Sequence, residues 1–171
     1  MTLKIRPAGI EDVEAIVGLL TPFAEQQLIL PRPRDDIYQH LQEFLVAEYD
    51  GVVAGAAAMH IYTSKLAEIR SLVVDGSHQG RGIGRLLVEA CEKWGAGLGV
   101  VNIFALTYVP GFFVGMGYER VPKESLPHKI WTVCIHCAKF ADCDEIAVQK
   151  RLSDETVEPV PVVPILEREN G

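Results

Sequence analysis

Six consecutive residues between an apolar run and an amphipathic stretch have the composition of an anion-binding loop. They are Gln79, Gly80, Arg81, Gly82, Ile83 and Gly84. Glycines let the backbone approach an anion closely, and the first N–H groups of a helix point at it with the positive end of the helix dipole. Arg81 and Arg85 add positive charge. The segment therefore predicts a pyrophosphate site at a strand-to-helix junction.

Two better-known phosphate loops do not match this segment. The loop of nucleotide hydrolases continues with Lys and then Ser or Thr after its last glycine, whereas Arg85 and Leu86 follow Gly84. A dinucleotide fingerprint that starts at Gly80 requires glycine or alanine at position 85, where this sequence has arginine. The alternative is a glycine-rich turn without a ligand, because glycine often simply marks turns.

The composition predicts one acidic globular domain. The chain has 171 residues, 49% of them hydrophobic, and a net charge of -7. This charge disfavours nucleic acid as a partner. No apolar stretch approaches the ~20 residues that cross a bilayer, and no basic segment followed by an apolar one opens the sequence. We expect a cytoplasmic protein with no membrane partner.

The spacing of apolar residues predicts alternating strands and helices. Asp50 and Gly51 predict a tight hairpin turn, so that three strands between 44 and 74 form an antiparallel meander. Pro31 and Pro33 predict a loop that carries Arg32 and Arg34, before a short helix capped by Asp35-Asp36. Strands are expected at 3–7, 44–49, 52–60, 67–74, 100–106, 118–121 and 146–152, and helices at 13–23, 35–41, 83–95 and 110–114.

The domain is expected to span residues 1–152, followed by a proline-containing C-terminal tail at 153–171. Pro159, Pro161 and Pro164 favour an extended tail. Its apolar stretch, 157–166, suits docking along an edge or a partner.

The pattern Gln79-x-x-Gly82-x-Gly84, between the apolar run 69–74 and a helix, resembles the acetyl-CoA signature of the GNAT N-acetyltransferases. The resemblance spans about residues 3–152, and 112–118 resembles the short helix and strand that follow in that family. It implies an α/β fold with a mixed central sheet, a splayed strand pair and flanking helices. It also implies that acetyl-CoA is bound as co-substrate by the loop and by the strand before it, whose backbone pairs with the pantetheine arm. The expected contacts are Leu72, Val73, Val74, Gln79, Gly80, Arg81, Gly82, Ile83, Gly84 and Arg85.

Two segments, 66–74 and 103–107, look most like the catalytic domain of the N-acetylglutamate synthases, here as a stand-alone short form without an amino-acid-kinase domain. This resemblance implies an amino-acid N-acetyltransferase that acetylates the α-amine of L-glutamate by direct transfer, the first step of arginine biosynthesis. Glutamine or another amine is the alternative acceptor. A non-catalytic acyl-CoA-binding sensor is the alternative class. The expected partner is a small-molecule amino acid, and a homodimer is left open.

Acetyl transfer to an amine requires a base, because an ammonium ion has no lone pair with which to attack the thioester. Glu68 matches the strand glutamate of the synthases and is the expected base. The alternative is a solvated strand glutamate or one paired with Arg70. Many acetyltransferases protonate the leaving thiolate with a tyrosine, but this sequence has Phe113 at the matching place. Thr107 is the expected substitute, with Tyr108 as the alternative.

A glutamate acceptor carries two carboxylates, which guanidinium groups bind bidentately. Arg32 and Arg34 align with a basic segment of the synthases, and Arg70 and Lys129 are further candidates. The alternative for each is a solvated surface charge.

One cluster of cysteine and histidine residues stands apart from this chemistry. Cys134 and Cys137 have a spacing common in zinc sites, with His136 between them and Cys143 and His128 nearby. The spacing to Cys143 matches no standard finger, so packed free thiols are the alternative to a structural zinc ion. A zinc-stabilised interaction module is a further alternative function.

Overall fold

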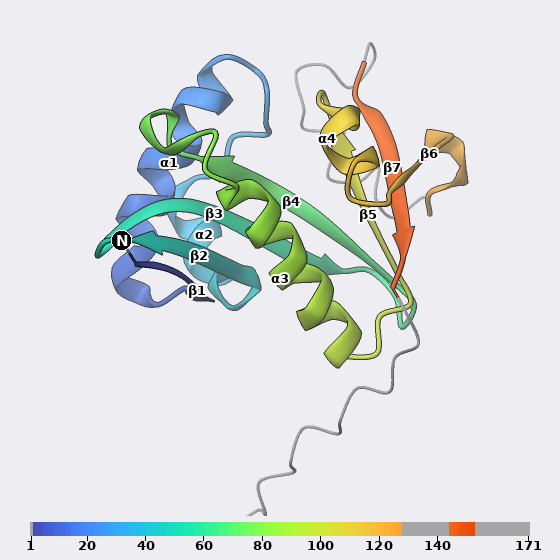
Figure 1. Ribbon diagram of the computed structural model, residues 1–171, viewed down its shortest axis with the longest axis horizontal. Coiled ribbons are helices and arrows are strands. Elements are labelled where there is room, and N and C mark those ends of the chain that lie inside the picture. The colour runs from blue at the N-terminus through green and yellow to red at the C-terminus, as the bar shows by residue number, and fades with distance from the viewer. Residues whose placement is uncertain (1, 128–143, 153–171) are drawn as a thin grey trace, which may run out of the picture.

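The computed structural model describes residues 2–127 and 144–152. They form a seven-stranded sheet with helices packed on both faces (Figure 1). The strand order is β1-β2-β3-β4-β5-β7-β6. The strands are β1 (Leu3–Pro7), β2 (Phe44–Tyr49), β3 (Val52–Ile61), β4 (Leu66–Val74), β5 (Asn102–Thr107), β6 (Glu119–Val121) and β7 (Ile146–Arg151). The main helices are α1 (Val13–Glu25), α2 (Arg34–Gln39), α3 (Ile83–Gly97) and α4 (Pro110–Val114).

The first four strands form a continuous antiparallel meander. Asp50 and Gly51 join β2 to β3 with φ values of 48° and 82°. Positive φ at both central residues matches the twist of a two-residue hairpin, and Asp-Gly is suited to it. The predicted hairpin and meander are confirmed.

Two hydrophobic clusters cover opposite faces of this meander. Ile83, Leu87 and Cys91 of α3 pack on one face, and Val13 and Ile16 of α1 pack on the other. Strand β3 contributes mostly alanine to both clusters, which lets the helices on the two faces approach the sheet closely. The central strands are therefore buried on both sides.

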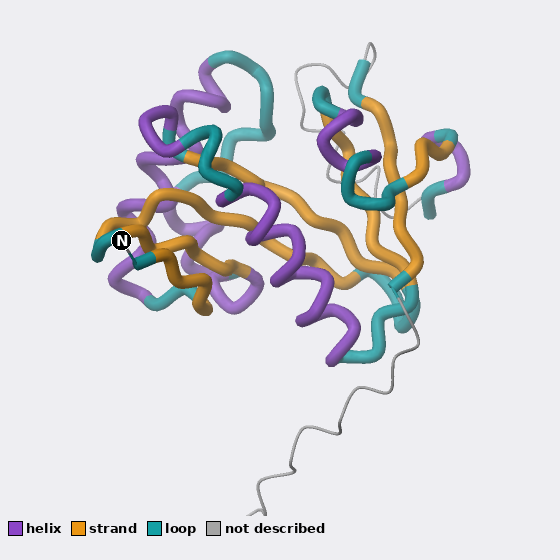
Figure 2. Tube along the Cα trace, viewed as in Figure 1, coloured by secondary structure: helices purple, strands orange, loops and turns teal. Residues whose placement is uncertain are grey.

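Strands β4 and β5 run parallel and separate after three residue pairs. Leu66, Ala67 and Glu68 are in register with Asn102, Ile103 and Phe104, and no later pair of the two strands is. Beyond that point β5, β7, β6 and α4 form a second arm, which diverges from the meander (Figure 2). The predicted splayed strand pair is confirmed, and β4 and β5 are not paired with each other beyond Glu68 and Phe104.

A bulge lies in β4 just beyond the separation. Ala58 is opposite Arg70 and Ala56 is opposite Val73, so Ser71 and Leu72 together face a single residue of β3. Ser71 has a φ of 54°, in the left-handed region. A bulge of this kind interrupts the ladder and redirects the backbone groups of the bulged strand.

The predicted elements all occur, with bounds that differ by a few residues. Two local predictions were wrong. Arg34 is the first residue of α2 and does not lie on the preceding loop, and Pro33 rather than an aspartate is the N-cap of that helix. Pro33 has extended backbone angles and its fixed φ suits the entry into a helix, so it ends the loop one residue earlier than expected.

Candidate active site

The N-terminus of α3 lies at the end of β4, where the glycine-rich segment forms the junction (Figure 1). Gly80 and Gly82 both have a φ of 78°, and Gly82 is the N-cap. The N–H of Leu86 is the first to bond back, to the Gly82 carbonyl at 3.1 Å. The N–H groups that precede it at the start of a helix are free to bind an anion.

The charged and polar side chains of this loop have partners on the protein. Arg81 donates to the Tyr49 hydroxyl at 2.8 Å, with its guanidinium 5.1 Å from the centre of the Tyr49 ring. Arg85 pairs with Glu89 at 3.0 Å and is mostly exposed. Gln79 donates to the Val74 carbonyl at 3.4 Å. The two arginines lie beside the helix N-terminus, and their exposed pairs are weak enough to exchange for an anion.

Three elements converge where the two arms of the sheet separate. A Cβ atom at Gly84 would lie 3.6 Å from the Phe112 ring of α4 and 3.7 Å from Val74 of β4. The side chains of Leu72 and Val74 lie on the α3 face, whereas Val73 is buried in the α1 face. The loop and the side chains of Leu72 and Val74 therefore lie together near α4, whereas the side chain of Val73 lies on the other face of the sheet.

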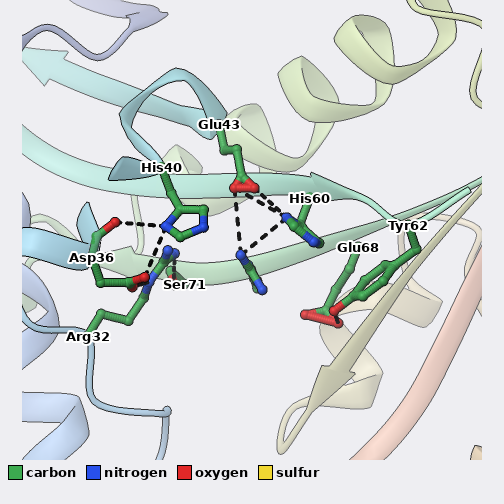
Figure 3. A network of polar contacts seen from close by, with 9 residues as sticks. Arg32, Asp36, His40, Glu43, His60, Tyr62, Glu68 and Ser71 are labelled. Atoms are coloured by element: carbon green, nitrogen blue, oxygen red, sulfur yellow. Dashed lines mark hydrogen bonds and ion pairs between the residues drawn. The ribbon is translucent and has the colours of Figure 1, made fainter. Parts of the chain in front are cut away.

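Glu68 is the last residue of β4 that pairs with β5, and it is only 8% exposed. Burial raises the pKa of Glu68 to about 7, with Glu145 adding to the rise, while Arg70, the Tyr62 hydroxyl and Arg32 oppose it. The Tyr62 hydroxyl donates to its carboxylate at 3.5 Å (Figure 3). The carboxyl group thus titrates near neutral pH and is suited to move a proton.

Thr107 is the last residue of β5 and is buried. Its Oγ1 accepts from the Val109 N–H at 2.9 Å, which leaves its own hydroxyl proton for donation to another group. Phe113 is buried between the rings of Phe112 and Tyr118 and has no proton to donate. Tyr108 is half-buried.

The three predicted acceptor arginines lie in different environments. Arg34 is half-exposed and forms an ion pair with Glu14 of α1. Its Nη2 donates to Glu14 Oε2 at 2.9 Å. Arg32 has a side chain only 7% exposed, donates to Asp36 at 2.7 Å and to Ser71 at 3.3 Å, and stacks over Phe44.

Arg70 follows Glu68 on the same face of β4. The charges of Arg32 and Arg70 both act on the carboxyl group of Glu68, whereas Arg34 pairs with Glu14 of α1.

A group of polar side chains beside Glu68 was not predicted from the sequence. It comprises Glu43, His60 and Tyr62. Figure 3 shows Tyr62 next to Glu68, and Glu43 in contact with His60. His60 is the cross-strand partner of Glu68, and the His60 and Tyr62 rings meet edge to face at 4.7 Å. Counting residue pairs outward from the turn between β3 and β4 places His60 opposite Glu68, and this count is the sequence signal that could have identified His60 as a site residue.

The cysteine and histidine cluster, Cys134, His136, Cys137 and Cys143 with His128, lies outside the described residues, as does Lys129. Within residues 2–127 and 144–152, no three histidine, cysteine, aspartate or glutamate side chains are grouped as a metal site would need. The structural zinc ion stays a prediction. Burial raises the pKa of the Cys91 thiol to about 12, so that thiol is protonated and packed in the core.

The same described ranges contain no helix that is both long and apolar enough to cross a membrane.

The sheet is splayed between β4 and β5, a glycine-rich segment precedes the N-terminus of α3, and the buried carboxyl of Glu68 lies where the strands separate. This is the arrangement expected of an acyl-CoA-dependent acyltransferase. The model of the "Acetyltransferase (GNAT) family" matches residues 13–112, and the chain belongs to this family. It is an N-acetyltransferase that uses acetyl-CoA as co-substrate.

Two groups of relatives are similar in sequence. An uncharacterized N-acetyltransferase of Chlorobaculum tepidum is 44% identical over 148 residues, which cover 86% of this chain and 96% of the relative. The amino-acid acetyltransferase of Mycobacterium tuberculosis is 33% identical over 68% of both chains. That of Pseudomonas aeruginosa is 31% identical over 72% of this chain, which spans only 29% of the longer relative.

Solved structures show the same arrangement. The N-acetylglutamate synthase of Neisseria gonorrhoeae, complexed with coenzyme A and N-acetyl-glutamate, matches with a TM-score of 0.82 and 26% identity over 90% of this chain and 36% of that one. A Mycobacterium tuberculosis protein in complex with CoA and NLQ matches with a TM-score of 0.76 and 28% identity over 88% and 99% of the two chains. The expected fold and co-substrate are thus confirmed.

Proposed function

We propose that this enzyme transfers the acetyl group of acetyl-CoA to the α-amine of L-glutamate. The observation that carries the proposal is the buried carboxyl of Glu68, whose pKa of about 7 suits a base at neutral pH and which lies where β4 leaves β5. The named relatives, amino-acid acetyltransferases and an N-acetylglutamate synthase, support an amino-acid acceptor. A place in arginine biosynthesis and in the cytoplasm belongs to the same proposal.

In the proposed reaction Glu68 removes a proton from the acceptor ammonium, directly or through one water molecule. The freed amine attacks the thioester carbon without an acyl-enzyme intermediate. The N–H groups of β4 near Leu72 and Val73, which the bulge redirects, stabilise the oxyanion. As the intermediate collapses, the attacking nitrogen loses a second proton, which neutralises the departing thiolate, and the Thr107 hydroxyl stabilises that thiolate by donating a hydrogen bond to it.

The glycine-rich loop holds the pyrophosphate of the co-substrate in this proposal. The N–H groups from Ile83 to Arg85 at the α3 N-terminus bind it, and Arg81 and Arg85 supply charge. Backbone groups of Leu72 to Val74 pair with the pantetheine arm along the open side of β4.

Arg32 and Arg70 are the proposed acceptor ligands. Both act on the charge of Glu68, so a carboxylate held by either stays near the base. Arg34 is left out of this proposal, because it is paired with Glu14 on the surface between α1 and α2.

Glutamine is the second candidate acceptor, and the pairing of the arginines favours it. Arg32 has Asp36 as a partner and Arg70 has Glu43, so neither cation is free of a protein carboxylate. These protein carboxylates offset part of the positive charge that would attract a second carboxylate on the acceptor, so glutamate is favoured less than the sequence alone suggested.

The test is release of free thiol from acetyl-CoA with a panel of amino acids and polyamines and a no-acceptor control. Release that depends on glutamate supports the proposal, and release with glutamine alone favours the second candidate. A preference for a polyamine would refute an amino-acid acceptor. Tight CoA binding without turnover of any acceptor would favour a sensor.

A further inference from the structure

Glu43, His60 and Arg70 form a connected group on the acceptor side of Glu68. Glu43 ends the 3-10 turn Leu41–Glu43 before β2, His60 lies on β3 and Arg70 on β4. His60 Nδ1 contacts a Glu43 carboxylate oxygen, and the second oxygen lies 3.6 Å from an Arg70 terminal nitrogen. Three separate elements therefore hold one carboxylate against one guanidinium.

The hydrogen bonds of this group cannot all form at once. Burial alone would raise the pKa of Glu43, but contact with His60 and the charges of His60 and Arg70 hold it below its usual value. Glu43 is therefore an anion and accepts a hydrogen bond from the N–H at His60 Nδ1. The same nitrogen then has no lone pair for the Arg70 N–H that lies 3.3 Å away.

Arg70 is consequently a cation with incomplete hydrogen bonding beside the proposed base. Its Nε is buried and has no partner among the described residues. A buried donor without a partner is costly, and an incoming carboxylate can satisfy it bidentately. Arg32, in contrast, already has Asp36, Ser71 and the Phe44 ring as partners.

The acids around the acceptor site outnumber its two arginines before an acceptor arrives. Arg32 and Arg70 offset Asp36 and Glu43, His40 contacts Asp36, and Glu68 and Glu145 are further acids near the site. An amino acid with one carboxylate is neutral overall. A dicarboxylate adds a net negative charge near these four acids.

We propose that Glu43 determines how strongly the site discriminates against an acceptor's second carboxylate, by offsetting the charge of Arg70. This inference rests on the proposed acetylation of an amino acid. It identifies Glu43 as a specificity-determining residue that acts through Arg70, and His60 as the residue that positions Glu43.

The test compares kcat/KM for glutamate and for glutamine in the wild type and in Glu43→Gln. The substitution removes a charge but keeps an oxygen that can accept from His60. We expect the glutamate-to-glutamine ratio to rise on the order of tenfold, mainly through KM for glutamate, because one charge a few ångströms away is only partly screened. Glu43→Asp, which keeps the charge, is expected to keep the ratio within about twofold.

Glu14→Gln is the matched control, because it removes the carboxylate of another arginine pair that lies away from Glu68. It should leave the ratio unchanged. His60→Asn should lower the ratio, since Glu43 without its His60 contact pairs more fully with Arg70. This variant provides a second test with the opposite sign if Glu43→Gln does not fold.

An unchanged ratio in a folded Glu43→Gln enzyme, or in His60→Asn where the former does not fold, would overturn the inference while leaving the proposed function intact. Turnover of neither amino acid by the wild type would overturn the proposed function and the inference with it.

Discussion

The two sides of the proposed site are built in different ways. On the donor side, around the α3 N-terminus, the binding groups are mostly backbone N–H groups from one short segment. On the acceptor side they are side chains from helix α2, from the loop that precedes α2, from the turn that precedes β2, and from the strands β3 and β4. The donor side depends on glycines that permit one backbone path, and the acceptor side depends on the registers of several strands.

This difference explains which part of the site is adaptable. Replacing a side chain on the acceptor side changes charge and shape without altering the sheet. Replacing a glycine of the donor loop changes the backbone itself. One donor loop of the proposed kind is therefore compatible with many different acceptor sites.

The largest effect is expected from Glu68→Gln, which should abolish most of the turnover while leaving the donor side able to bind acetyl-CoA. We expect kcat to fall about 100- to 1,000-fold because the general base is lost, with acetyl-CoA affinity little changed. In the wild type, turnover should decline as pH falls below about 7, because Glu68 becomes protonated. Steady-state kinetics and a CoA-binding titration measure both effects. Turnover that equals the wild type at every pH would remove Glu68 from the role of base.

The same substitution should stabilise the protein at alkaline pH. The pKa of Glu68 rises from 4.5 to about 7 on folding, so the folded protein holds a proton that the unfolded chain loses between these values. Stability from this group is therefore present below pH 4.5 and lost as pH rises through about 7, a difference of about 3 kcal/mol.

The stability of Glu68→Gln relative to the wild type should accordingly increase between pH 5 and pH 8. Denaturant unfolding at the two pH values measures this difference. A constant difference would mean that the pKa of Glu68 is not raised in the folded protein.

On the donor side, Gly82→Ala should raise KM for acetyl-CoA about tenfold. Gly82 has a φ of 78°, and a residue with a Cβ pays about 1–2 kcal/mol to adopt it, although the space itself is open. Gly18→Ala on α1 is the control, because its Cβ also meets open space but its backbone is helical. Equal KM values in the two variants would contradict the donor-side assignment.

The smallest effect is expected from Arg34→Gln. Because Arg34 and Glu14 form an exposed pair, their loss should change neither the melting temperature measurably nor KM for the amino acid by more than about twofold. A large rise in KM for the amino acid would show that Arg34 takes part in acceptor binding. The ion pair between Arg34 and Glu14 would then have to break when the amino acid binds.

Local sequence patterns predicted most of the fold. The alternation of apolar residues in the meander, the Asp50-Gly51 turn and the apolar face of α3 each specify their structure within a short window. The donor loop is equally local, and its position was predicted for the same reason.

The acceptor side could be predicted only in part. Glu68 and Arg70 lie in one strand, but Glu43 and His60 join them only through the β2–β3–β4 registers and the turn before β2. Arg34 was predicted as an acceptor ligand together with Arg32 because both align with a basic segment of the synthases, yet the start of α2 turns the two side chains to different partners. The bulge at Ser71 is not visible in a pattern of alternating residues.

The separation of β4 from β5 gives the sheet an edge in its interior. Exposed strand edges at the periphery of a sheet invite pairing with other chains and hence aggregation. Beyond Glu68 and Phe104 the register between the two strands ends, so their facing backbone groups border a gap that narrows to a closed ladder. A gap of this shape suits one extended chain of limited length and offers little to the strand of another protein molecule. If the pantetheine arm pairs here as proposed, the protein has a backbone pairing surface for its co-substrate without the risk of aggregation that an open peripheral edge carries.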